Sequence, residues 1–91
     1  MPHDRPVALV TGAAKRVGAR IARRLHGAGY DLALHHRRSE AEMATLASEL
    51  EATRPGSVLV LQAELGDDGA PEALVQATLD RFGRLDALVN N

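Results

Sequence analysis

The chain has 91 residues and a formal net charge of −1, and 45% of its residues are hydrophobic. This length predicts one small domain or part of one, and the near-zero charge gives no general reason to expect nucleic acid or a membrane as a partner. Cysteine is absent from the sequence, which excludes disulfides, zinc–thiolate sites and thiol chemistry. The segment 1–6 lacks the apolar run of a signal peptide and no apolar stretch is long enough to span a membrane, so we expect a cytoplasmic protein.

The first part of the chain predicts a strand, a helix and a second strand. An apolar run at 7–10 (VALV) has no polar alternation, which is typical of a parallel strand covered on both faces. After a turn at 11–15, helical periodicity predicts a helix over 16–28. The inner stripe of this helix is expected at four-residue steps, at Val17, Ile21 and Leu25. A second strand follows at 31–36 (DLALHH).

A second helix is predicted from Ser39, as its N-cap, to about Thr53. Its buried face is expected to consist of Met43, Leu46, Ala47 and Leu50. A third strand at 57–62 is again apolar, and the loop 63–69 follows it, with Asp68 as a candidate cap for the next helix. Each helix is thus expected to present one apolar face to a sheet.

A third helix and a fourth strand complete the sequence. Pro71 fits the first turn of this helix, and Gly83 ends it. The inner side of the helix is expected to consist of Leu74, Val75, Thr78, Leu79 and Phe82. The fourth strand is predicted over 85–89.

Strands that alternate with helices predict an α/β fold with a doubly wound parallel sheet and right-handed crossovers. In such a sheet the strand order begins 3-2-1-4, so the fourth strand lies beside the first. A chain that ended there would leave an apolar parallel strand as a bare edge, which is an aggregation hazard. We therefore expect residues 1–91 to be the N-terminal part of a single longer domain, or to be completed by another chain.

The segment 11–18 (TGAAKRVG) lies between the first strand and the first helix. In this context Gly12 permits a tight turn, and Gly18 lets the helix pack closely on the sheet. Such a turn directs backbone N–H groups at the start of a helix toward an anion, usually a phosphate. The segment is not a P-loop, because no Gly-Lys-Ser/Thr follows at the required spacing. The alternative is a structural turn in an α/β domain with no ligand.

The tip of the second strand reads HHRRS (35–39), with no acid before Glu40. An acid at this point would bind the ribose 2′-hydroxyl of NAD, whereas two guanidinium groups and a hydroxyl favour the 2′-phosphate of NADP(H). Lys15 could reach the same phosphate. The alternative is a solvated basic loop. A metal site is not expected, because His35 and His36 point to opposite faces of the strand and no third ligand is evident.

Two further segments follow the third and fourth strands, at the edge of the sheet where ligands bind. Glu64, in the triplet AEL (63–65), is a candidate acceptor for the adenine amino group, with an ordinary loop acid as the alternative. Asn90 and Asn91 are candidates for holding the cofactor ribose or for bracing neighbouring backbone, with a simple turn as the alternative.

Together these segments resemble the short-chain dehydrogenase/reductase family, a group of Rossmann-fold enzymes. The resemblance covers essentially the whole chain and is carried by TGAAKRVG, the basic strand tip, AEL and the final NN. The family usually has a third glycine where this sequence has Arg16, and more often Asp where Glu64 stands. The arginine itself resembles the pteridine-reductase branch, whose turn reads T-G-x-x-x-R-x-G and whose strand tip is of the type H-x-x-R-S, matched here by His35, Arg38 and Ser39.

The resemblance implies a role for each of the segments. Around the pyrophosphate it places Gly12, Lys15, Arg16, Val17 and Gly18. Around the 2′-phosphate it places His36, Arg37, Arg38 and Ser39. It places Glu64 and Leu65 at the adenine and Asn90 at the adjacent ribose, and it implies that Arg16 also faces the substrate. The catalytic Tyr-x-x-x-Lys pair of the family would lie beyond Asn91, because Tyr30 is the sole tyrosine and has no lysine partner, so no catalytic residue is assigned.

The activity implied by the resemblance is hydride transfer from NADPH to a C=N or C=C bond of a pterin or dihydrofolate-like ring. The nicotinamide carries this chemistry, and the present residues supply binding and orientation. One alternative is a ketoacyl- or sugar-alcohol-type carbonyl reductase on the same fold. Another is a noncatalytic NADP(H)-sensing module. The family also implies a small-molecule substrate and a homo-oligomer.

Overall fold

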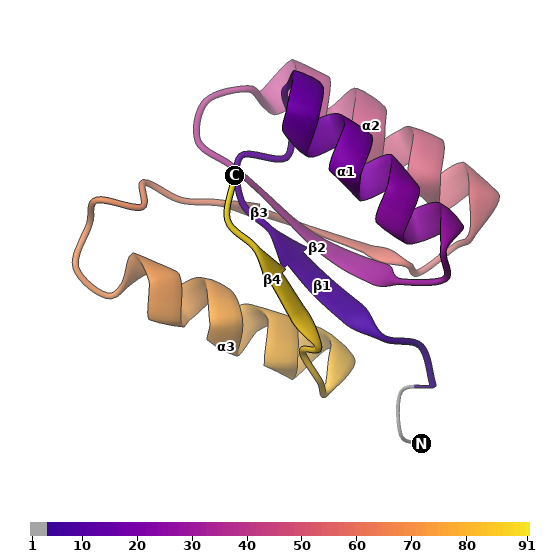
Figure 1. Cartoon of the computed structure of the whole chain (residues 1–91). Coiled ribbons are helices and arrows are strands. Elements are labelled where there is room, and N and C mark those ends of the chain that lie inside the picture. The colour runs from indigo at the N-terminus through magenta and orange to yellow at the C-terminus, as the bar shows by residue number, and fades with distance from the viewer. Residues whose placement is uncertain (1–3) are drawn as a thin grey trace.

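The computed structural model describes residues 4–91 and shows one parallel sheet with helices on both faces (Figure 1). The strands lie in the order β3-β2-β1-β4, and every neighbouring pair is parallel. The elements are β1 (Val7–Val10), α1 (Arg16–Gly27), β2 (Asp31–His36), α2 (Glu40–Thr53), β3 (Val58–Gln62), α3 (Ala70–Phe82) and β4 (Ala87–Val89). Helices α1 and α2 cover one face, and α3 covers the other (Figure 1). The predicted α/β class and the 3-2-1-4 strand order are therefore confirmed.

The two central strands are buried along their whole length, which explains why their sequences show no polar alternation. All residues of β1 and β2 are buried. Successive side chains point to opposite faces, so the strands supply two cores. Ala8, Val10, Leu32 and Leu34 pack beneath α1 and α2, whereas Leu9 and Ala33 pack with Leu74 of α3 on the other side.

Helix α1 has the predicted period, but its inner face is rotated by about one residue from the predicted stripe. Val17 is 61% exposed, which makes that part of the prediction wrong, while Ile21 and Leu25 are half-buried. The buried residues of the helix are Gly18, Ala19, Ala22 and His26. Most of these side chains are small or absent, so the helix can approach the sheet more closely than a helix with a leucine or valine stripe.

The other helices agree more closely with the sequence. In α2, Met43, Leu46 and Leu50 are buried and Ala47 packs against them, as predicted. Ser39 occupies the N-cap position but makes no side-chain cap hydrogen bond.

The predictions for α3 need two corrections. The predicted cap Asp68 is wrong, because Gly69, with a φ of 79°, is the N-cap residue. A left-handed backbone of this kind favours glycine, which has no Cβ to clash. Leu79 is 38% exposed, whereas Leu74, Thr78 and Phe82 are buried.

Three predicted element boundaries shift by one or two residues. Helix α1 ends at Gly27, β3 begins at Val58, and β4 begins at Ala87. Ser57 and Asp86, which were predicted in strands, lie outside them and make polar side-chain contacts. The buried hydroxyl of Ser57 contacts His26, and the carboxylate of Asp86 accepts a hydrogen bond from the backbone N–H of Val7.

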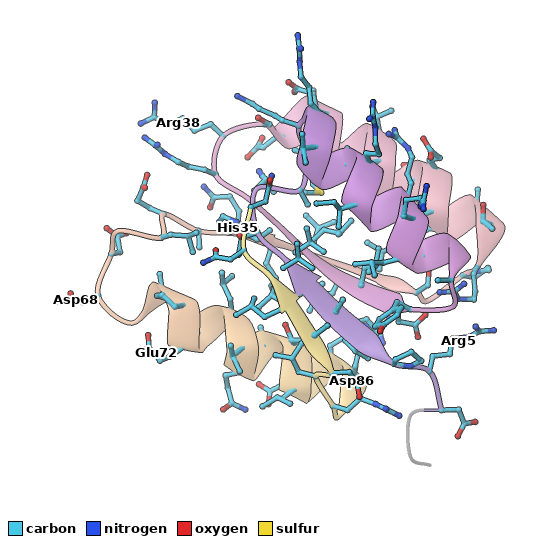
Figure 2. The ribbon with its side chains drawn as sticks, in the orientation of Figure 1. Arg5, His35, Arg38, Asp68, Glu72 and Asp86 are labelled. Carbon is cyan, nitrogen blue, oxygen red and sulfur yellow. The ribbon has the colours of Figure 1, made fainter. Side chains whose placement is uncertain are left out.

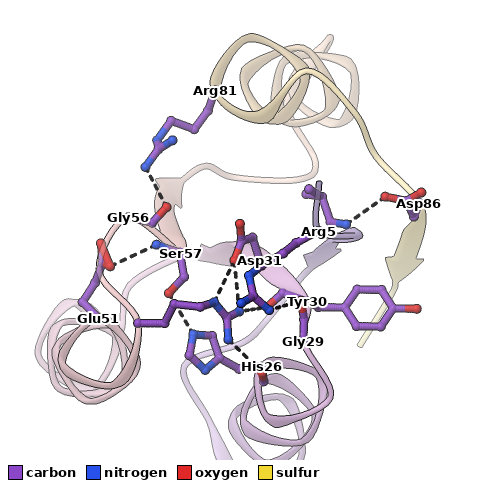
Figure 3. Close-up of polar contacts among 12 residues, drawn as sticks. Arg5, His26, Gly29, Tyr30, Asp31, Glu51, Gly56, Ser57, Arg81 and Asp86 are labelled. Carbon is purple, nitrogen blue, oxygen red and sulfur yellow. Dashed lines mark hydrogen bonds and ion pairs between the residues drawn. The ribbon is translucent and has the colours of Figure 1, made fainter. Parts of the chain in front are cut away.

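A polar cluster at the amino ends of the strands ties α1, β2 and α2 together (Figure 3). The Arg54 guanidinium donates to the carboxylate of Asp31 at 3.0 and 3.2 Å, and to the carbonyls of His26 and Tyr30. Beside it, Nε2 of His26 lies 2.8 Å from the Ser57 hydroxyl. Burial lowers the pKa of His26 below its ordinary value, and the nearby Arg54 charge lowers it further. The folded state therefore favours the neutral imidazole.

This cluster predicts a loss of stability in mild acid. Because the pKa of His26 is lower in the folded than in the unfolded state, the unfolded state binds more protons as the pH falls through about 6.5. The free energy of unfolding should therefore fall on acidification between about pH 7.5 and about pH 5.5. A His26→Gln variant, which cannot titrate, should show a shallower fall in urea denaturation. Equal slopes for the two proteins would contradict this account.

Candidate functional site

The turn between β1 and α1 lies at the carboxyl ends of the strands. Gly12 has a φ of 59°, which favours glycine. Gly18 packs directly against this turn, because a Cβ added to Gly18 would lie 2.3 Å from the carbonyl oxygen of Gly12. The start of α1 therefore rests on the backbone of the turn itself, and the geometry agrees with the roles predicted for the two glycines.

His35, at the end of β2, holds one side of the turn. The backbone N–H of Gly12 donates to its Nδ1 at 3.1 Å, and the N–H of Ala13 donates to its carbonyl oxygen at 2.9 Å. The Nε2 atom lies 2.8 Å from the carbonyl oxygen of Ala63, after β3. Figure 2 shows His35 at this carboxyl end of the sheet. The sequence placed this residue in the H-x-x-R-S strand tip and as a weak metal candidate, but did not predict that both of its ring nitrogens are engaged in hydrogen bonds with backbone.

The end of β4 holds the other side of the turn. The hydroxyl of Thr11 donates to Oδ1 of Asn90 at 3.0 Å and accepts from the backbone N–H of Asn91 at 3.0 Å. The side-chain amide of Asn91 donates to the carbonyl of Gly12 at 3.2 Å. Of the two roles considered for the asparagines, bracing of neighbouring backbone is therefore visible in the structure. A ribose contact of Asn90 stays a prediction.

A cavity of about 380 Å³ opens beside the turn and brings most of the predicted phosphate residues together. It is lined by Gly12, Ala14, Lys15, His36, Arg37, Arg38 and Ser39. Lys15 and Arg38 are exposed cations on its wall. His36 is only 5% exposed, and its Nδ1 atom is buried with no hydrogen-bond partner in the part of the chain that the structure describes. A ligand with anionic oxygens suits the two exposed cations.

The two arginines of the strand tip differ in their partners. Nε of Arg37 lies 2.7 Å from the carboxylate of Glu64, and the carbonyl of Arg37 accepts a hydrogen bond from the side chain of Gln62. Arg38 is exposed and has no acidic partner within residues 4–91 (Figure 2). The positive charge of Arg38 is thus available to an anion, whereas that of Arg37 is already partly neutralised.

Four of the remaining predicted residues line other cavities. Leu65 and Asn90 border a cavity of about 270 Å³ on the α3 side of the sheet. Arg16 and Val17 border an open cavity on the α1 side, together with Asn91. Arg16 has a φ of 22°, so its backbone lies on the side of conformational space that favours glycine. This is the position where the family that the sequence resembles usually has glycine, and here an arginine adopts a backbone conformation with positive φ.

Comparison with known proteins identifies the architecture around this site. The sequence model of the short chain dehydrogenase family matches residues 6–91. The chain belongs to the short-chain dehydrogenase family. This family implies a nicotinamide dinucleotide, NAD or NADP, as the cofactor. The glycine turn and the basic cavity lie where such a cofactor would be held in a Rossmann-like sheet.

Individual relatives in this family are reductases of several kinds. The chain is 46% identical to pteridine reductase 1 of Leishmania tarentolae, over 94% of this chain and 36% of the relative. It is 39% identical to levodione reductase of Leifsonia aquatica, over 93% of this chain and 32% of the relative. It is 34% identical to a 3-oxoacyl-(acyl-carrier-protein) reductase of Staphylococcus aureus, over 92% of this chain and 34% of the relative. The chain thus spans about a third of the length of these relatives.

The described residues form neither a membrane-spanning helix nor a cluster of metal ligands. Within residues 4–91, no helix is both long enough and apolar enough to cross a membrane. The same residues contain no group of three or more His, Cys, Asp or Glu side chains that could hold a metal ion.

The contact between Gly18 and the turn predicts that one methyl group added at position 18 lowers the stability of the fold. Gly18→Ala would force the carbonyl of Gly12 away, which should lower the free energy of unfolding by about 1–3 kcal/mol. Gly27→Ala is the matched control, because a Cβ at Gly27 meets nothing within 4 Å and alanine favours the helix. Urea denaturation of both variants checks this expectation. Equal stability of the two variants would show that the close approach is not a constraint.

Proposed function

We propose that this chain is the cofactor-binding part of an NADPH-dependent reductase that acts on a pterin or a dihydrofolate-like ring. The observation that carries the choice of NADPH is the cavity that gathers Lys15, Arg38 and Ser39 with no acid among its lining residues. The choice of substrate is supported by the 46% identity to pteridine reductase 1. The coverage of about a third of each relative also supports residues 1–91 as one portion of a single Rossmann domain.

The residues around the cavity fit the 2′-phosphate of NADP. Lys15 and Arg38 would supply positive charge and Ser39 a hydroxyl donor. An NAD-specific site would instead place an acid here to bind the 2′-hydroxyl. Glu64 does not line this cavity, and its carboxylate is paired with Arg37.

The glycine turn would hold the pyrophosphate through its later amides. The N–H groups of Gly12 and Ala13 are already bonded to His35. Among the groups left for a phosphate are those at the start of α1, at Arg16, Val17 and Gly18, where the helix dipole also favours negative charge. Glu64 and Leu65 at the adenine, Asn90 at the ribose and Arg16 facing the substrate stay predictions, as do a homo-oligomer and a cytoplasmic location.

When bound, the nicotinamide supplies the hydride, and the residues described here bind and orient the cofactor. The contribution of this region to catalysis is therefore the placement of the dinucleotide. The part of the chain that the structure describes contains no tyrosine–lysine pair of the catalytic type, because Tyr30 is the only tyrosine and lies between α1 and β2. The groups that would transfer protons to the substrate are proposed to lie beyond Asn91.

Arg38 should discriminate between the two dinucleotides. In the complete protein, Arg38→Ala should weaken NADPH binding by about tenfold or more, because a charge-assisted contact to the 2′-phosphate is lost, and should leave NADH binding nearly unchanged. Arg24→Ala, which removes an exposed arginine that lines no cavity described here, is the control for a general charge effect. Fluorescence titration with both cofactors provides the measurement. Equal losses for NADPH and NADH would rule out the 2′-phosphate assignment.

The substrate class is tested by activity of the complete protein with NADPH. Reduction of a pterin or dihydrofolate, without reduction of a β-ketoacyl thioester, is the expected result. The reverse pattern would favour the carbonyl-reductase alternative, which the 34% identity to a 3-oxoacyl-(acyl-carrier-protein) reductase also supports. Cofactor binding without turnover of either substrate would favour the noncatalytic module.

A further inference from the structure

His35 occupies a position that links three separate segments of the sheet edge. Its side chain is 3% exposed, and its two ring nitrogens contact backbone on opposite sides. One contact is with the glycine turn after β1, and the other is with the loop after β3. The β2 strand that carries His35 lies between those two strands in the sheet. The imidazole is therefore placed as a bridge across the carboxyl ends of three neighbouring strands.

The chemistry of the two partners determines which nitrogen carries the hydrogen. A carbonyl oxygen can only accept, so Nε2 of His35 must donate its hydrogen to Ala63 over the distance of 2.8 Å. A backbone N–H can only donate, so Nδ1 must be bare and accept from Gly12 over 3.1 Å. Both contacts are satisfied only by the neutral imidazole with its hydrogen on Nε2.

The side chain and backbone of His35 together engage two consecutive amides of the turn. Nδ1 accepts from Gly12, and the His35 carbonyl accepts from Ala13 at 2.9 Å. A turn that begins with glycine has many accessible conformations when it is free, and these two bonds select one of them. With two amides bonded to it, His35 contributes, together with Gly18 and Asn91, to fixing the turn that leads into α1.

We infer that His35 is a positioning residue that couples the pyrophosphate turn to the adenine-side loop of the cofactor site. This inference rests on the proposed function, because both segments are assigned there to the dinucleotide. The Gly12 contact presents the amides at the start of α1, and the Ala63 contact holds the segment that leads into Glu64. Loss of the bridge should weaken NADPH and NADH equally, because the pyrophosphate and adenine are common to both.

Two substitutions separate the two halves of the bridge. In His35→Asn, Oδ1 is bonded to Cγ as Nδ1 is in histidine, so it can accept from Gly12 but the bond to Ala63 is lost. In His35→Gln, the longer side chain can place an N–H donor toward Ala63 but has no acceptor next to Gly12. Each of the two variants therefore removes one of the two contacts, and their side chains are of similar polarity.

The experiment combines amide hydrogen exchange without cofactor and titrations of the complete protein with NADPH and NADH. His35→Gln should accelerate exchange at the Gly12 amide at least tenfold and weaken both cofactors by a similar factor, about fivefold to tenfold. His35→Asn should keep the slow exchange at Gly12 but, because the bond to Ala63 is lost, should still weaken both cofactors, by about threefold to fivefold; native affinity in this variant would show that the Ala63 half of the bridge does not contribute. Wild-type affinity in the Gln variant, or a loss confined to NADPH, would overturn the inference.

A measurement on the unsubstituted protein keeps the inference testable if a variant does not fold. Nitrogen-15 spectra of the histidine ring should show hydrogen on Nε2 and a bare Nδ1 for His35. Hydrogen on Nδ1 would overturn the bridge directly. If the native protein bound neither dinucleotide, the proposed function would fail, and so would the coupling of His35 to a cofactor site. The ring spectra and the Gly12 exchange would still show whether the His35 bridge itself is formed.

Discussion

The close approach of α1 to the turn after β1 is the constraint on which the rest of this structure depends. Gly18 leaves no room for a side chain against the carbonyl of Gly12, and the buried face of the helix continues with alanines. This brings the start of the helix to the edge of the sheet, where its amides can face a ligand. His35 from β2 and Asn91 after β4 then hold the turn from its two sides.

Positive charge gathers at the site, although the chain as a whole is nearly neutral. The net charge is −1, yet the cavity beside the turn is lined by cations and a hydroxyl and by no acid. Arg37 is paired with Glu64, so the two arginines at the strand tip are not equivalent. An exposed ion pair of this kind contributes little to stability, but it reduces the charge that Arg37 can offer to an anion. If the cavity takes a phosphate, as we propose, its selectivity would depend chiefly on Arg38 and Lys15.

Some features of the site could not be read from local patterns. As neighbours in a strand, His35 and His36 were predicted to point their side chains to opposite faces. The sequence did not predict that His35 would accept a hydrogen bond from Gly12 or that His36 would line a cavity. Those outcomes depend on the parallel register that sets β2 beside β1 and β3. The phase of α1 was likewise missed, because the four-residue steps of Val17, Ile21 and Leu25 are apolar and outweigh glycine and alanine in a periodicity argument. The helix instead turns its smallest residues inward, where backbone contact is closest.

The sequence by itself determined the parallel sheet, its strand order, the glycine turn and the basic strand tip. The strand order follows from the doubly wound topology, and the other features follow from short-range chemistry: uninterrupted apolar runs, the spacing of Gly12 and Gly18, and the lack of an acid before Glu40. Only the tertiary structure decided that His35 bridges Gly12 and Ala63 and that Arg37 is paired with Glu64. The partners in each case are separated by more than twenty residues along the chain, so their contact requires the strands to be assembled side by side. Hydrogen bonds and ion pairs depend on distances of a few ångströms, and only the folded arrangement sets those distances.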